Sequence, residues 1–193
     1  MQSSNHIAFK EWAVICAALG DGLQSLILRK GGIQEGPGGF QVEHREFWLF
    51  STYLHQAADG LIDEAQPLLR RVLADQPRSD LVRIGLYAVV HDVFEVREPD
   101  VVAHLAGLHA WSTRTVFERF NYKRPGLFVL PVRVYRLAAP FEMPNSEYFA
   151  GCRSWVELPS DLPTSGAEPV LSDAVFAEQL AAIRRAVSPI RLA

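Results

Sequence analysis

A glycine-rich segment near the N-terminus constrains the fold of this chain most. Five glycines and one proline lie between Gly31 and Gly39, a composition that excludes a helix or a regular strand there. The segment joins an apolar, strand-like run, Leu23–Arg29, to a run rich in aromatic residues, Glu46–His55. We therefore expect two strands joined by a surface loop, where binding groups tend to gather.

Composition and charge indicate a globular domain and exclude some classes of protein. The chain has 193 residues, 49% of them hydrophobic and 21% charged, as expected for a single well-cored domain. Its net charge of −3 excludes a generic basic DNA-coating protein, so any nucleic-acid contact must come from a local patch. Two cysteines without metal-ligand spacing predict a reducing compartment. We expect a cytoplasmic protein without a membrane span, metal or cofactor.

The N-terminal apolar run has the spacing of a helix. Phe9, Trp12, Cys16 and Leu19 recur at helical intervals, and Gly20 follows where a helix often ends. β-Branched residues inside the run leave an extended conformation as the alternative.

Later segments predict further strands and helices. Ile84–Val96 carries apolar residues on both faces and is expected to be a long central strand. Leu127–Leu137 is expected to be a strand whose Pro131 lies at an edge or bulge. The other expected elements are a short strand, Arg153–Leu158, and helices that start near Pro67, Pro99, Ser112 and Ser172.

This order of elements does not alternate strictly between strands and helices. It predicts an α+β fold, either a mixed, partly antiparallel sheet or a small β-barrel with helices packed outside. Residues 1–140 are expected to form the main domain. Residues 141–193 are expected to form a proline-rich wrapping segment and a C-terminal amphipathic helix packed on that domain.

Several motifs resemble the bacterial family known as domain of unknown function 1802. The resemblance extends from about Phe9 to Pro140, and the family implies no established activity or catalytic residues. Its association with restriction-endonuclease-type catalytic domains implies a link to nucleic acid and to restriction or defence systems. The motifs are Phe9–Ala13, Arg29–Gly32, His44–Phe50 with Tyr53, His55 and Gln56, and Tyr122–Pro140.

A weaker resemblance is to PUA-like domains of the ASCH and EVE branches. Those domains begin with a helix, a glycine and a strand that ends in a charged residue, as Gly22–Arg29 does. The resemblance implies a PUA-like barrel that binds RNA or modified bases. Gln24 and Leu28 stand where lysine and glutamate are more common, which puts any catalytic version of that site in doubt.

Candidate ligand-binding residues flank the glycine-rich segment, and one more lies far along the chain. Two cations would contact phosphate, a histidine and a carboxylate on one strand face would orient the ligand, and aromatic rings would stack on a base. The alternatives are a charged network that fixes the loop and aromatic residues that belong to the core. The set is Arg29, Lys30, His44, Arg45, Glu46, Trp48, Tyr53, His55 and Trp111.

The predicted function is recognition of RNA, or of single-stranded or modified DNA. The first alternative is a Mg²⁺-dependent nuclease built on Asp80 and Glu95, where Arg97 stands in place of the lysine such enzymes use. The second alternative is a non-catalytic partner subunit. A stretch of arginine and lysine interleaved with aromatic residues, Arg114–Arg124, would face either a phosphate backbone or solvent.

Overall fold

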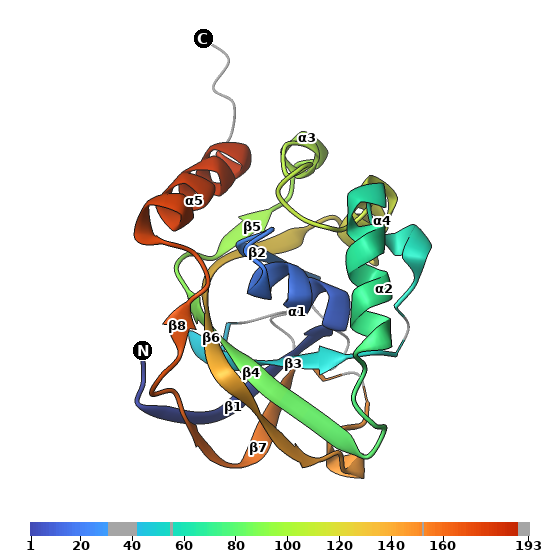
Figure 1. The fold of residues 1–193 in the computed structure, drawn as a ribbon. Helices are drawn as coiled ribbons and strands as arrows, with labels where there is room; N and C mark the ends of the chain where they lie inside the picture. Colours follow the sequence, from blue (N-terminus) through green and yellow to red (C-terminus); the bar gives the residue numbers. More distant parts are fainter. Residues whose placement is uncertain (31–41, 55, 152, 189–193) are drawn as a thin grey trace.

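The centre of the molecule is a mixed sheet of eight strands with the helices gathered on one side (Figure 1). The computed structural model describes residues 1–30, 42–54, 56–151 and 153–188. No helix in these ranges is long and apolar enough to cross a membrane. The predicted α+β class is confirmed.

The order of the six principal strands is β2-β6-β4-β3-β1-β7, and β5 and β8 also pair with β6. Among the described residues, every ladder is antiparallel except that between β1 and β3, so the sheet is mixed and partly antiparallel, as the sequence predicts. The strands are β1 (Ser4–Trp12), β2 (Leu26–Arg29), β3 (Glu46–Thr52), β4 (Leu81–Val90), β5 (Phe94–Val96), β6 (Leu127–Pro144), β7 (Trp155–Pro163) and β8 (Glu168–Pro169).

The 18-residue strand β6 connects the two parts of the sheet. Its first residues pair with β2 and β5, and from Val132 onward it pairs with β4. The changeover comes directly after Pro131, where a missing backbone N–H costs little. Within the described ranges no ladder joins β2 to β7, so the sheet is open and the barrel alternative does not hold.

The first apolar run is divided between a strand and a helix. Phe9 and Trp12 belong to β1, and the helix α1 (Ala13–Gly20) begins only after them. The helical interpretation fails for Phe9–Trp12 because β1 pairs with β3 on one side and β7 on the other. The helix ends with Gly22 in the left-handed conformation (φ 71°), and the N–H groups of Gly22 and Leu23 donate to the carbonyls of Leu19 and Ala18.

The remaining helices begin close to the expected positions. They are α2 (Gln66–Ala74), α3 (Pro99–Ala103), α4 (Thr113–Asn121) and α5 (Asp173–Val187). Ser112 and Ser172 are the predicted N-caps, and their hydroxyl groups accept hydrogen bonds from the N–H groups of Thr115 and Val175. The expected strand Ile84–Val96 is instead two strands, β4 and β5, which follow one another along β6 and are interrupted at residues 91–93, opposite Pro131.

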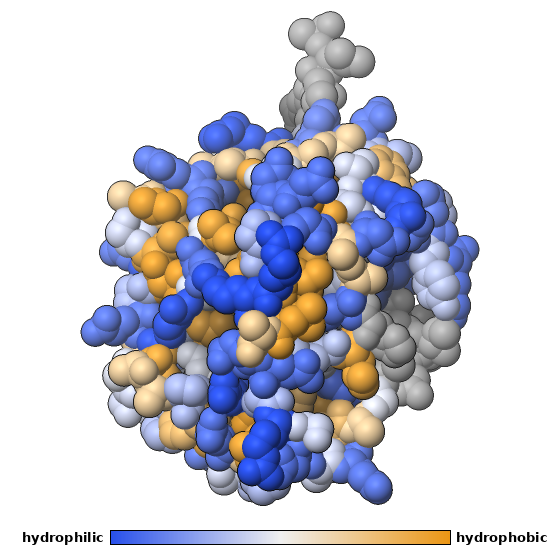
Figure 2. All heavy atoms as spheres, turned by 45° about the vertical axis from the view of Figure 1, so that its right-hand side comes forward, coloured by the Kyte–Doolittle hydropathy of each residue, from blue (hydrophilic) through white to orange (hydrophobic). Residues whose placement is uncertain are grey.

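Two apolar clusters bury the faces of the sheet. The larger lies between the sheet and α1, α2, α4 and α5, and the smaller surrounds Trp48 and Tyr87 on the other face. Figure 2 shows one face of the molecule, on which hydrophilic side chains alternate with apolar ones that gather towards the middle.

Candidate nucleic-acid interface

A buried carboxylate lies at the junction of β1 and α1. Glu11 is 2% exposed, and its Oε1 atom accepts a hydrogen bond of 2.8 Å from the N–H of Trp12. Its Oε2 atom has no hydrogen-bond partner within the described part of the chain. A buried acceptor without a partner costs folding free energy, and such atoms often mark a functional position.

The last residue of β2 brings a cation to this carboxylate. The Arg29 Nη1 atom is 3.9 Å from Oε2 of Glu11, and its guanidinium carbon is 4.5 Å from the centre of the Phe9 ring. Its Nη2 atom donates to the Lys10 carbonyl (3.1 Å) and to the Ser154 hydroxyl (3.0 Å). Its Nε atom is buried and has no partner among the described residues. Arg29 is therefore held in place through Nη2, and its buried Nε–H has no acceptor among the described residues.

A second arginine and two tryptophans complete this environment. The Arg119 guanidinium of α4 lies 3.7 Å from the centre of the Trp111 ring and 5.8 Å from that of Trp12. Burial lowers the pKa of Arg119, and the charge of Glu11 opposes this shift. Trp111 is 1% exposed, and its indole N–H has no partner in the described ranges.

Gln56 adds a further unused donor next to the start of α1. Its side-chain oxygen accepts a hydrogen bond of 2.9 Å from the N–H of Val14, which fixes the amide orientation. Its Nε2 atom is buried without a partner in the residues described. We call these residues the Glu11 cluster: Glu11, Arg29, Gln56, Trp111 and Arg119. The cluster offers one acceptor and several donors to a ligand.

A basic, aromatic surface follows α4. Lys123 and Arg124 are exposed, and Tyr122 is 50% exposed with its ring 5.6 Å from the Lys123 ammonium group. The Lys30 ammonium group ties the end of β2 to this turn, because it donates to the carbonyls of Phe120 (2.9 Å) and Gly126 (2.8 Å) and to that of Arg124. Burial and the charge of Arg124 lower the pKa of Lys30.

We expect Lys30 to act mainly on stability. Lys30→Met removes charge-assisted hydrogen bonds to three carbonyl groups and should lower the free energy of unfolding by roughly 1–3 kcal/mol in urea denaturation. The matched replacement Lys123→Met, at an exposed side chain, should change it by less than about 0.5 kcal/mol. Equal effects of the two replacements would contradict this role.

The His44–Glu46 segment does not form the predicted pair. The strand begins only at Glu46, whose carboxylate accepts hydrogen bonds from the Gln2 N–H (2.7 Å) and the Tyr87 hydroxyl (3.0 Å). The His44 ring precedes the strand and packs at 5.2 Å on Trp155. The prediction that His44 and Glu46 share a strand face is wrong because the chain bends at Arg45, which is exposed.

Arg29 and His44 nevertheless contact the same pair of packed aromatic rings, Phe9 and Trp155. Phe9 lies against the Arg29 guanidinium and is 4.7 Å from the Trp155 ring, which in turn contacts His44. Glu46 is separated from both, because it is bound to Tyr87 of the opposite apolar cluster. The described residues thus link Arg29 to His44 only through the rings of Phe9 and Trp155, and Glu46 is bound on the opposite face.

The aromatic candidates occupy different places. Trp48 is 0% exposed and belongs to the smaller apolar cluster, whereas Trp111 is buried in the larger one. Both are core residues in this structure, the alternative that the sequence left open. Tyr53 is half-buried, and burial raises its pKa. His55, like the predicted loop between Gly31 and Gly39, lies outside the described residues.

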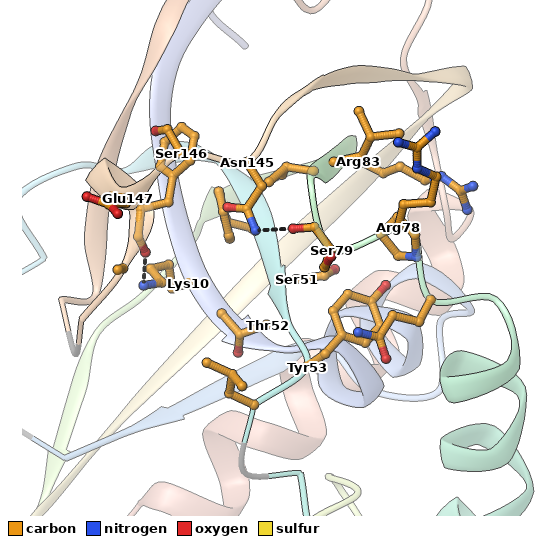
Figure 3. A pocket seen from close by; sticks show the side chains of 18 of the residues that line it. Lys10, Ser51, Thr52, Tyr53, Arg78, Ser79, Arg83, Asn145, Ser146 and Glu147 are labelled. Carbon is orange, nitrogen blue, oxygen red and sulfur yellow. Dashed lines mark hydrogen bonds between the residues drawn. The ribbon is translucent and has the colours of Figure 1, made fainter.

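A groove of about 480 Å³ opens between β3 and β4 (Figure 3). The ladder between the two strands ends at Trp48 and Tyr87, and β4 then continues with β6 alone. Its polar groups are largely bound to one another: Lys10 to the Phe149 carbonyl, and Asn145 to the Ser79 carbonyl. None of the buried polar atoms that lack a hydrogen-bond partner among the described residues belongs to the groove lining, whereas Glu11 and Arg29 each carry one, so we favour the cluster.

The carboxylates of the nuclease alternative do not meet. Asp80 is paired with Arg78 beside the end of β6, and Glu95 is paired with Arg97 beside its beginning. In the part of the chain that is described, no three acidic, histidine or cysteine side chains are placed to hold a metal ion. The pair proposed from the sequence therefore has no shared site in this geometry.

Three cluster residues were absent from the predicted set: Glu11, Gln56 and Arg119. Glu11 and Gln56 lie within or beside the motifs that carry the family resemblance, and Arg119 lies in the basic, aromatic stretch after Ser112. None of these signals shows that the Arg119 guanidinium lies close enough to the Glu11 carboxylate for their charges to interact. That information comes only from the pairing of β1 with β3 and the packing of α4.

Comparison with solved structures finds an ASCH protein from Zymomonas mobilis. Its Y47F mutant is 11% identical, with 92% of this chain and 96% of that chain covered and a TM-score of 0.43. The unmutated protein is 10% identical over 92% and 94%, with a TM-score of 0.41. These structures are similar to this one, but at such scores nothing about function follows from the likeness.

Comparison with families gives a clearer result. No curated protein matches the chain. The sequence profile of a family described as "domain of unknown function" matches residues 8–182, a range that contains both Glu11 and Arg119 and extends beyond the predicted end at Pro140. The chain belongs to this family, DUF1802.

Proposed function

We propose that this protein binds single-stranded nucleic acid, RNA in the first place, at the Glu11 cluster and the basic surface beside it. The observation that carries the proposal is the buried Oε2 atom of Glu11, which has no hydrogen-bond partner among the described residues and whose nearest cation, Nη1 of Arg29, is 3.9 Å away. Three donors of the same cluster are likewise buried and unused by the described residues. A ligand that reached Oε2 of Glu11 and the adjacent Arg29 guanidinium would satisfy both groups.

The surroundings match the chemistry of single-stranded nucleic acid. Proteins that bind single strands combine cations along the backbone with aromatic or guanidinium planes that stack on bases. Here Lys123 and Arg124 supply exposed positive charge, Tyr122 supplies an exposed ring, and Arg119 supplies a guanidinium plane. The positive charge is local, as a chain with a net charge of −3 requires.

The test is fluorescence anisotropy with labelled 12-nucleotide RNA and DNA at several salt concentrations. We expect binding that weakens steeply with salt. Replacing both Lys123 and Arg124 by alanine should lower the slope of log affinity against log salt by about 1.4, because each phosphate contact of a single strand contributes about 0.7. Absence of binding at low salt would overturn the proposal.

The control removes equal charge from the groove between β3 and β4. Arg78 and Arg83 both line it, and the double replacement Arg78→Ala with Arg83→Ala should leave the affinity and the slope unchanged. If the groove variant loses the binding instead, the interface lies at the groove and the assignment to the Glu11 cluster is wrong.

A further inference from the structure

We infer that Glu11 determines specificity by accepting a hydrogen bond from the edge of one nucleobase. This inference rests on the proposed function and names the contact that would make binding depend on the base. The base would enter edge-on, with an N–H group directed at Oε2 of Glu11 and an adjacent acceptor directed at Arg29.

The first step is the set of unused atoms. Within the described ranges, Oε2 of Glu11 is a buried acceptor and Nε of Arg29 a buried donor, and neither has a hydrogen-bond partner; Nη1 of the same guanidinium is 3.9 Å from Oε2. A nucleobase edge that carries an N–H group beside a carbonyl oxygen or ring nitrogen complements a protein site in which one acceptor lies next to donors. A phosphate group carries acceptors only and would face the Glu11 carboxylate with like charge.

The second step is the rigidity of the two central groups. Glu11 is fixed through Oε1 by the Trp12 N–H, and Arg29 is fixed by the Lys10 carbonyl and the Ser154 hydroxyl. The atoms left over therefore keep their directions without a ligand, which favours selective recognition over adaptable contact. Because Glu11 is buried, a base whose edge offers no N–H group would bind more weakly, since it would leave Oε2 without a hydrogen bond.

The third step distinguishes the contact between Glu11 and the base from the contacts that Lys123 and Arg124 would make with the phosphate backbone. Lys123 and Arg124 lie outside the cluster on the exposed turn after α4, where they suit a backbone that is the same for every base. Changes at these cations should weaken all ligands alike, whereas a change at Glu11 should alter the ranking of ligands.

The experiment uses RNA heptanucleotides that carry one base between abasic residues, measured by isothermal titration with the full chain. The bases are the four standard ones, and for each a form in which methyl groups block the N–H donors: N3-methyluracil, N6,N6-dimethyladenine, N4,N4-dimethylcytosine and N1,N2,N2-trimethylguanine. In 5-methyluracil the donor stays free. For the preferred base, the blocked form should bind at least about tenfold more weakly, as expected for loss of a hydrogen bond to a charged group. The 5-methyl form should bind as its parent does.

The variant Glu11→Gln tests the residue itself. Its side chain keeps the shape but loses the charge, so the preference for the unblocked base should fall to about threefold or less. Lys123→Ala is the control and should weaken every ligand without changing their ratios. Circular dichroism spectra and melting curves of both variants check that the fold is retained.

The outcomes are distinguishable. Equal binding of blocked, unblocked and wholly abasic heptanucleotides by the natural protein would overturn the role of Glu11 while the proposed function stands. This comparison needs no variant, so it remains decisive even if Glu11→Gln does not fold. If no heptanucleotide or 12-nucleotide strand binds at low salt, the proposed function fails and this inference fails with it.

Discussion

Acidification from pH 6.5 to about 4 is expected to lower the free energy of unfolding by roughly 3 kcal/mol through His109. Burial lowers the pKa of His109 from 6.5 to about 4, with a smaller contribution from the charge of Arg119. In this pH range the unfolded chain binds a proton that the folded protein does not. Stability therefore rises with pH until about 6.5, above which His109 is neutral in both states.

The measurement is urea denaturation at half-unit pH intervals, for the natural protein and for His109→Gln. The variant should lose most of the His109 contribution to the slope, although the lowered pKa of His91 adds a slope of the same sign to both proteins. His104→Gln, at an exposed position, serves as the matched control. A slope that is unchanged in His109→Gln would contradict the assignment.

Replacement of Trp48 by alanine should lower the free energy of unfolding by roughly 4 kcal/mol. The ring is fully buried, contacts Tyr87 at 4.8 Å, and donates its indole N–H to the Asn5 carbonyl at 2.9 Å. Its removal would leave a large cavity in the smaller apolar cluster. Urea denaturation followed by circular dichroism measures the loss.

Trp48→Phe separates a core role from a stacking role. This milder change should leave RNA affinity unchanged, because Trp48 lies in the apolar cluster opposite the one that contains Trp111. Tyr122→Ala is the converse control, since a half-exposed ring should change stability by less than about 0.5 kcal/mol while weakening binding. Loss of affinity in Trp48→Phe with the fold intact would restore Trp48 as a ligand contact.

Local chemistry was enough to predict several elements. The caps at Ser112 and Ser172 and the amphipathic stripe of α5 depend on residues close in sequence, and the structure contains all three. The same is true of β3, which begins at the predicted Glu46. Such features are encoded by side chains that act within a few residues of one another.

Features set by distant pairing were predicted less well. Phe9 and Trp12 have helical spacing, yet β3 and β7 hold them in a strand. His44 and Glu46 have the spacing of one strand face, yet only Glu46 is in the strand. The polar cluster depends on Glu11, Arg29 and Arg119, which are far apart in the chain, so of these three the sequence identified only the arginine that ends β2.

The central claim is that a single-stranded nucleic acid fills the Glu11 cluster, and side-chain NMR tests it most directly. Two-dimensional ¹H–¹⁵N spectra resolve arginine Nε–H and tryptophan Nε1–H groups, and four tryptophans can be assigned by replacement. On titration with RNA, the signals of Arg29 and Trp111, whose N–H groups lack partners among the described residues, should shift together and saturate. The Trp48 signal is the internal reference, because its N–H is already bonded to Asn5. Saturable binding that leaves Arg29 and Trp111 unchanged and shifts the amide signals of Ser51, Ser79 and Asn145 in the groove would contradict the account.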